Sequence, residues 1–109
     1  MGIYENPSTW GRSTWKLLHC ISMTYPKNPT ESDKKKYKSF LNQLRHVLPC
    51  KICRNSYSAW IRDHPPDLRS RAKIVGWVID LHNYVNKRLG KPILKKREAL
   101  KEIHKICQN

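Results

Sequence analysis

Two cysteines two residues apart are the side chains of this sequence best placed to do chemistry. Cys50 and Cys53 lie in the stretch LPCKICRN, directly after Pro49. A pair with this spacing can be a redox-active disulfide, half of a zinc site or two ordinary core thiols. Pro49 places Cys50 at the first turn of a helix, where unpaired N–H groups and the helix dipole favour a thiolate. Cys53 lies one turn on and can reach back to form a disulfide, so the position favours a redox pair.

A zinc site would need two more ligands. The remaining candidates are Cys20, Cys107, His64 and His104, which form neither a second C-x-x-C nor a histidine pair with zinc-site spacing. A thioredoxin-like site is excluded for another reason, because that motif belongs to a βαβ context, and here a helix is predicted before it. The cysteine pair is therefore interpreted as the redox centre of a helical protein.

Two further segments place polar and aromatic side chains on one helical face. The first face consists of Arg12, Trp15 and His19, and the second of His82, Val85, Asn86 and Leu89. A planar aromatic ligand with a diphosphate would suit such faces, stacking on Trp15 while Arg12, Lys87 or Lys91 meets the phosphates. Taken alone, each face is more typical of core packing. No glycine-rich nucleotide-binding loop is present.

Helical periodicity runs through the whole sequence and predicts the elements that must position these residues. The expected helices span about 8–24, 31–48, 50–61, 68–89 and 95–105. Ser8 or Thr9 is the candidate cap of the first, and Thr30 with Asp33 forms a capping-box pattern before the second. Gly90 follows the fourth, as expected beyond a helix end. No segment alternates with period two, so we predict an all-α fold, a four-helix bundle with a short fifth helix.

The inner faces of these helices are apolar. The second helix carries Tyr37, Phe40, Leu41, Leu44, Val47 and Leu48; the third carries Cys53, Tyr57, Trp60 and Ile61; the fourth carries Ile74, Trp77, Val78, Leu81, His82, Val85 and Leu89. With 109 residues and no linker, the chain is predicted to form one domain, residues 1–109.

The charge is strongly positive: 22 Lys and Arg against 8 Asp and Glu give a formal net charge of +14. Such a surface attracts polyanions, although basic residues scattered along a chain equally form a plain solvated face. No apolar run approaches the roughly 20 residues of a membrane span, and the amino terminus shows no secretory signal. These features predict a cytoplasmic protein and leave open a small basic nucleic-acid-binding module with non-redox cysteines.

Taken together, three segments resemble the Erv/ALR family of FAD-linked sulfhydryl oxidases. They are WGRSTWKLLHCISMTYP, LPCKIC and HPPDLRSRAKIVGWVIDLHNYVNKRLGKP, in this order, within residues 10–92. The resemblance implies a small helical bundle that holds FAD at its mouth, usually as a homodimer. It implies a thiol oxidase that forms disulfides in a dithiol protein substrate, with O2 as the electron acceptor and H2O2 as the product.

The resemblance also assigns residues. From the first segment the expected FAD contacts are Gly11, Arg12, Trp15, His19 and Tyr25, and from the third they are His82, Asn83, Val85, Asn86, Leu89 and Lys91. Cys53 would lie against the isoalloxazine, and Cys50 would be the interchange thiol that meets the substrate. A core this short looks most like the minimal viral members of the family, which implies the host cytoplasm or the virion as its location.

The sequence departs from the family pattern at several positions. Ile61 and Asp80 stand where many members have a structural disulfide, and Ile103 stands where an aromatic residue is often found near the flavin. Cys107 is a single cysteine near the carboxyl terminus, expected to be a shuttle, a bridge between subunits or a plain surface thiol. Cys20 is expected to be buried by packing.

Overall fold

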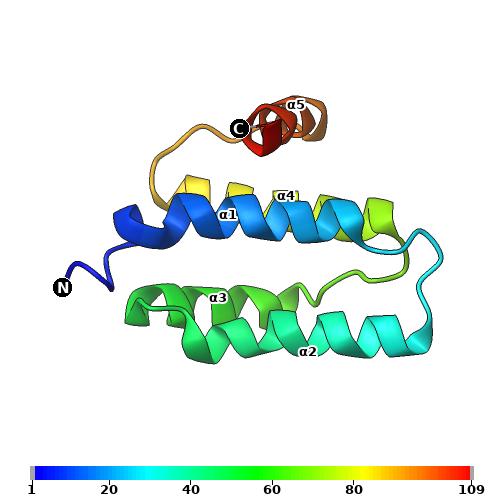
Figure 1. Ribbon diagram of the computed structural model, residues 1–109. Coiled ribbons are helices and arrows are strands. Elements are labelled where there is room, and N and C mark those ends of the chain that lie inside the picture. The colour runs from blue at the N-terminus through cyan, green and yellow to red at the C-terminus, as the bar shows by residue number, and fades with distance from the viewer. Residues whose placement is uncertain (1, 109) are drawn as a thin grey trace.

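Five helices form the part of the chain that the computed structural model describes, residues 2–108, and this range contains no strand (Figure 1). They are α1 (Pro7–Thr24), α2 (Glu31–Val47), α3 (Lys51–Asp63), α4 (Arg71–Arg88) and α5 (Lys96–Gln108). The all-α prediction is confirmed, and α5 extends three residues beyond its predicted end. The two outermost residues of the predicted domain, 1 and 109, lie outside the described range.

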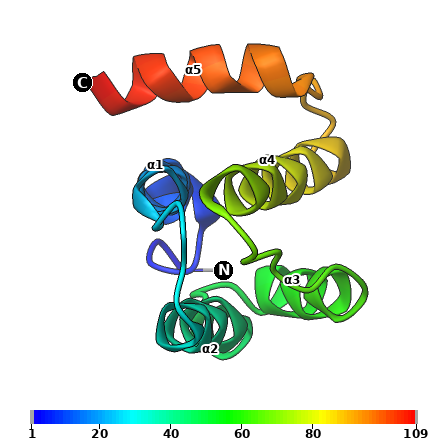
Figure 2. The ribbon, with the colours of Figure 1, turned by 90° about the vertical axis from the view of Figure 1, so that its right-hand side faces the viewer.

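The first four helices form two layers. In one layer α1 packs against α4, and in the other α2 packs against α3. Viewed from the end, α5 runs across the outer side of the α1–α4 layer, away from α2 and α3 (Figure 2). Its contacts are with α1 and α4, so α5 covers one face of the bundle instead of extending it.

Capping side chains fix where the helices begin. Thr30 and Asp33 form the predicted capping box of α2, with the Asp33 N–H donating to Thr30 Oγ1 at 3.1 Å and the Thr30 N–H to Asp33 Oδ2 at 2.9 Å. The cap predicted for α1 at Ser8 or Thr9 is wrong. Asn6 is the cap, because its side chain accepts the Ser8 N–H at 3.0 Å and Pro7 then occupies the first helical position, where no N–H is needed.

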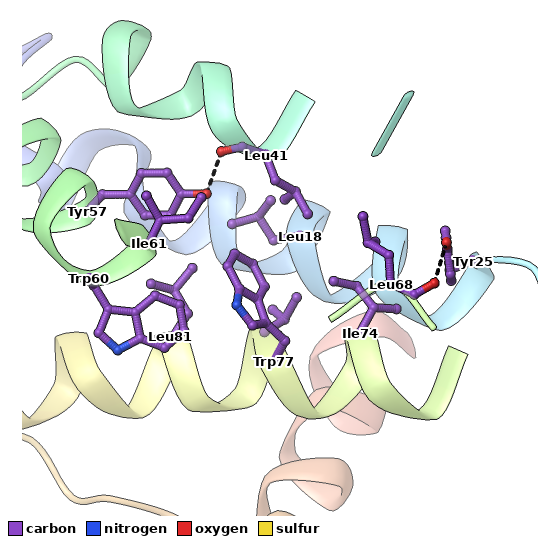
Figure 3. Packing of buried hydrophobic residues seen from close by; sticks show 11 residues of the cluster. Leu18, Tyr25, Leu41, Tyr57, Trp60, Ile61, Leu68, Ile74, Trp77 and Leu81 are labelled. Atoms are coloured by element: carbon purple, nitrogen blue, oxygen red, sulfur yellow. Dashed lines mark hydrogen bonds between the residues drawn. The ribbon is translucent and has the colours of Figure 1, made fainter. Parts of the chain in front are cut away.

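The hydrophobic core lies between the two layers (Figure 3). Its helical members are Leu18 from α1, Leu41 from α2, Tyr57, Trp60 and Ile61 from α3, and Ile74, Trp77, Val78 and Leu81 from α4. The polar ends of Tyr57 and Trp77 are satisfied, as buried polar groups require. The Tyr57 hydroxyl donates to the Leu41 carbonyl, and Trp77 Nε1 donates to the His64 carbonyl at 2.9 Å. These bonds fix how α3 meets its neighbours.

A smaller cluster fastens α5 to the bundle. Val75 and Ile79 on the outer side of α4 pack with Ala99 and Ile103 of α5, and all four are buried. The chain reaches α5 through Leu89 and Gly90. The φ of Gly90 is 70°, which suits a residue without a side chain.

Some predicted inner-face residues are on the surface. Phe40 is 42 % exposed, Val47 66 % and Leu89 58 %. Periodicity identifies an apolar stripe, but no other element of the described chain covers these parts of the stripe. The helices of the described range also include none that is long and apolar enough to cross a membrane.

Candidate redox and cofactor site

Cys50 is the N-cap of α3. Its backbone is extended (φ −111°, ψ 126°), and its Sγ accepts the N–H of Cys53 at 3.3 Å. Its carbonyl accepts the Arg54 N–H at 2.9 Å, which starts the helix. Cys50 is 3 % exposed, whereas Cys53 is half-buried. Both thiols thus meet at the start of one helix.

The pKa values of the two thiols are shifted in opposite directions. Burial raises the pKa of Cys50, but hydrogen bonds from the Cys53 side chain and from the N–H groups of Cys53 and Ile52, with the charge of Arg54, hold it below its usual value. Burial raises the pKa of Cys53 to about 11, and the hydrogen bond and charge of Cys50 add to this, while Arg88 acts in the opposite direction. The reduced pair therefore loses its first proton from Cys50.

His19, His82 and Trp15 form a cluster between α1 and α4. The rings of Trp15 and His82 are stacked, with centroids 3.9 Å apart and an interplanar angle of 7°. A hydrogen bond of 2.9 Å joins His19 Nε2 and His82 Nδ1. Burial lowers the pKa of both imidazoles to about 4, helped by His82 in the case of His19 and by Lys91 in the case of His82. The pair is neutral at pH 7.

A cavity of about 50 Å³ lies beside this cluster, under α5. Its lining includes His19 from α1, His82 and Asn86 from α4, and Ile103 and Ile106 from α5. A wider hollow of about 520 Å³ shares Asn86 with it, and its charged lining residues are Lys91, Lys101 and Lys105 with Glu98 and Glu102. The cavity beside the cluster therefore adjoins a hollow lined by charges of both signs.

The cluster is suited to a flat, hydrogen-bonding group such as the flavin of FAD. His19 Nδ1 is buried and has no hydrogen-bond partner, so a ligand with a polar ring edge would satisfy it. A side chain at Gly11 would contact nothing within 4 Å, which leaves space beside α1.

The structure brings some of the predicted FAD contacts together and leaves others apart. Trp15, His19, His82 and Asn86 gather at the cluster and cavity. Arg12, Leu89 and Lys91 are exposed, and Gly11 and Val85 are half-buried.

Two predicted contacts are engaged within the protein. Tyr25 is fully buried, its hydroxyl donates to the Leu68 carbonyl at 2.8 Å, and its ring meets Tyr37 edge-on. The structure thus does not bring Tyr25 into the cluster. Asn83 lines the cavity and brackets the backbone of Leu94: Nδ2 donates to its carbonyl at 2.8 Å and Oδ1 accepts its N–H at 3.1 Å. Asn83 therefore fixes the connection between α4 and α5.

The remaining predictions concern the departures from the family pattern. Ile103 is buried and lines the cavity with His19 and His82. Ile61 lies in the core between the layers, while Asp80 is on the exposed face of α4. In the part of the chain described, no three His, Cys, Asp or Glu side chains are arranged to hold a metal ion.

The expectation for Cys20 is wrong. It is half-buried, and its Sγ lies 3.2 Å from that of Cys107. The two residues are 87 positions apart in the sequence, and α5 brings them together by crossing α1 (Figure 2). Sequence reasoning missed this pair because its only trace is one cysteine in each of two helices whose docking cannot be predicted locally.

Comparison with known proteins gives a consistent result. The model of the Erv1/Alr family matches residues 12–105. A probable FAD-linked sulfhydryl oxidase, R368 of Acanthamoeba polyphaga mimivirus, is 42 % identical over 103 residues, which cover 92 % of this chain and 72 % of that protein. The mitochondrial FAD-linked sulfhydryl oxidase ERV1 of Saccharomyces cerevisiae is 42 % identical over 82 residues, 75 % of this chain but 43 % of ERV1.

A solved structure shares the fold. The crystal structure of the FAD-binding domain of Erv1 from Saccharomyces cerevisiae superposes with a TM-score of 0.81 at 36 % identity. The match covers 89 % of each chain. The similarity therefore extends over nearly the whole helical bundle.

Proposed function

Because this chain belongs to the Erv1/Alr family and is an FAD-linked thiol oxidase, we propose that Cys50 and Cys53 are its redox-active pair. The observation that carries this proposal is the helix cap, in which Cys50 Sγ accepts the Cys53 N–H and both sulfurs share one turn. FAD would be held by Trp15, His19 and His82, with Asn86 and Lys91 towards the wider hollow. When bound, FAD accepts an electron pair from the dithiol and passes it to O2, which gives H2O2.

The protein's own step is thiol–disulfide exchange. A substrate thiolate attacks Cys50 Sγ, the Cys50–Cys53 bond breaks, and Cys53 leaves as a thiolate. The second substrate thiolate then displaces Cys50, so the substrate leaves as a disulfide and both cysteines are reduced. Since Cys50 is 3 % exposed, the attack requires a local opening at the start of α3.

Nearby groups stabilise the sulfur anions of this step. The N–H groups of Cys53 and Ile52 and the charge of Arg54 stabilise the Cys50 thiolate. Cys53 is the weaker acid and hence the poorer leaving group, and Arg88 is the cation that offsets this. Arg88 is therefore assigned as a positioning residue for the exchange.

A homodimer is part of the same proposal. Leu17 on α1 is 55 % exposed and Phe40 on α2 is 42 % exposed, and α1 and α2 lie at the same side of the bundle (Figure 2). Apolar side chains left on a surface favour association. We propose that these two residues contribute to the interface.

The substrate is proposed to be a small dithiol protein. The relative from mimivirus is viral, which supports a location in the host cytoplasm or the virion. The names of the relatives described above are those of sulfhydryl oxidases, so they give no support to the nucleic-acid-binding alternative.

Colour and turnover test the function. Purified protein should be yellow with flavin absorbance, and it should consume O2 with dithiothreitol as substrate. Cys53→Ser should abolish this turnover, while Asn55→Ser, an exposed position on α3, should retain it. A folded but colourless protein, or turnover without Cys53, would overturn the proposal.

A trapping experiment identifies the substrate. In the Cys53→Ser protein, Cys50 can attack an oxidised partner but cannot be displaced by its neighbour, so a mixed disulfide should accumulate. Mass spectrometry of the reduced adduct would name the partner. If the adduct formed through Cys107 instead, Cys50 would not be the interchange thiol.

A further inference from the structure

The second pair of cysteines lies outside the exchange reaction described above. Cys20 belongs to α1 and Cys107 to the last turn of α5, and their Sγ atoms are 3.2 Å apart. A disulfide bond measures about 2.05 Å, so the sulfurs need to approach by roughly 1 Å. Cys107 is exposed and Cys20 is half-buried, which leaves the pair open to an external oxidant.

The last turn of α5 is less buried than the part of the helix before it. The buried residues that dock α5, Ala99 and Ile103, lie in its first two-thirds. After them, Ile106 is 37 % exposed and Gln108 is exposed. Ile103 and Ile106 line the same cavity as His19. The thiol contact thus lies at the less buried end of α5.

We propose that Cys20 and Cys107 are a second disulfide site, formed within one chain, that latches α5 across α1. The role of this latch rests on the proposed function: the closed bond keeps Ile103 and Ile106 over the cavity and so retains FAD. Opening it frees the end of α5 and uncovers the cavity that Ile103 and Ile106 line.

The bond forms by exchange with a small-molecule disulfide. One cysteine thiolate attacks the disulfide and expels one small thiol, giving a mixed disulfide on the protein. The second thiolate displaces the other small thiol and closes the Cys20–Cys107 bond. The two cysteines lose two protons and two electrons, and the small disulfide takes up both to become two thiols.

Disulfide mapping tests the site directly. The protein is incubated with excess oxidised glutathione, alkylated and cut with trypsin without reduction. Cleavage after Lys16, Lys27 and Lys105 puts Cys20 and Cys107 on separate peptides, and cleavage after Arg45 and Lys51 separates both from Cys50. We expect the Cys20 and Cys107 peptides to be linked in a protein that runs as a monomer on a non-reducing denaturing gel.

Two results of the mapping would overturn the proposal. Alkylation of both Cys20 and Cys107 after the oxidation would mean that the bond does not form. A Cys107–Cys107 link between two chains would mean that Cys107 bridges subunits. If the Cys20–Cys107 bond forms but the purified protein contains no flavin, the FAD assignment is refuted and the disulfide site stands. If the protein contains flavin but the bond does not form, only the second disulfide site is refuted.

The latch itself is tested with serine variants. In the oxidised state, Cys20→Ser and Cys107→Ser should each melt on the order of 10 °C below the wild type, because the bond closes a loop of nearly the whole chain. Both should release FAD several-fold faster, measured by the fluorescence of free flavin. Gln108→Ser is the matched control and should match the wild type. Equal melting and equal flavin release in all four proteins would refute the latch.

Discussion

Cys50 and Cys53 occupy different environments although two residues separate them. The thiol of Cys50 receives hydrogen bonds at the helix start, whereas burial dominates at Cys53. Arg88 is the cation that favours the Cys53 thiolate. The difference in acidity between the two sulfurs therefore depends on a residue of another helix, α4.

Replacing Arg88 tests this dependence. Arg88→Gln should raise the pKa of Cys53 further and slow dithiothreitol oxidation several-fold, because a thiol of higher pKa is a poorer leaving group. A titration of thiolate ultraviolet absorbance should show the later ionisation moving to higher pH. Lys87→Gln, an exposed neighbour, is the control, and equal rates and titrations in both variants would remove Arg88 from the exchange step.

The histidine pair makes stability depend on pH. His19 and His82 have pKa values of about 4 in the folded protein against 6.5 in the unfolded chain. The unfolded chain therefore binds protons first as the pH falls, and stability is lost between about 6.5 and 4. Urea unfolding should show an uptake of up to about two protons in this window.

Replacing His19 and His82 by glutamine tests whether they cause this pH dependence of stability. The His19→Gln/His82→Gln protein should lose most of this pH dependence, whereas His104→Gln, on the exposed face of α5, should keep it. An unchanged slope in the double variant would mean that other groups titrate there.

At the scale of helices, α1 to α4 each begin at a residue whose side chain accepts a backbone N–H of the first turn. In α2 the Thr30 side chain and the Asp33 carboxylate do this together. Thr30→Ala should lower the free energy of unfolding by about 1 kcal/mol, measured by urea denaturation. Ser32→Ala, exposed in the same turn, should change it much less, and equal losses would show that the box does not stabilise α2.

The helices could be predicted from sequence because the forces that make them are local. Apolar residues three and four positions apart mark α2 and α4, and the Thr30–Asp33 pattern marks a start. The contact of Cys20 with Cys107 spans 87 positions, and the bond from Tyr25 to Leu68 spans 43. Such contacts depend on how whole helices dock, which no local pattern encodes, so the second thiol pair and the role of Tyr25 in the core could not be predicted.

At the scale of the whole molecule, the surface has apolar residues that the bundle does not use. Phe40 and Leu17 are the ones proposed for the dimer interface. Phe40→Glu should shift the protein from dimer to monomer in sedimentation velocity, because a charge would be buried at the contact. Ser39→Glu, the exposed neighbour, should leave the dimer intact. A monomeric wild type would refute the interface.

The core between the layers should carry the stability of the bundle. Ile61 is 6 % exposed and packs among residues of α1, α2 and α4. Ile61→Ala should cost about 2–5 kcal/mol in urea denaturation, whereas Ala59→Gly, exposed on the same helix, should cost about 1 kcal/mol. A loss at Ile61 no larger than at Ala59 would mean that the layers are held elsewhere.

The cap of α3 also bears on the reduction potential of the proposed redox pair, Cys50 and Cys53. A cap made of sulfur interacts best with the helix start when that sulfur is a thiolate, because the N–H groups and the dipole stabilise negative charge. These interactions favour the reduced pair over the disulfide, and stabilising the reduced form raises the reduction potential. Each factor of ten gained in this way is worth about 30 mV. If Cys50–Cys53 is the redox-active pair, as proposed, the fold of this helix end makes it a stronger oxidant of its substrates.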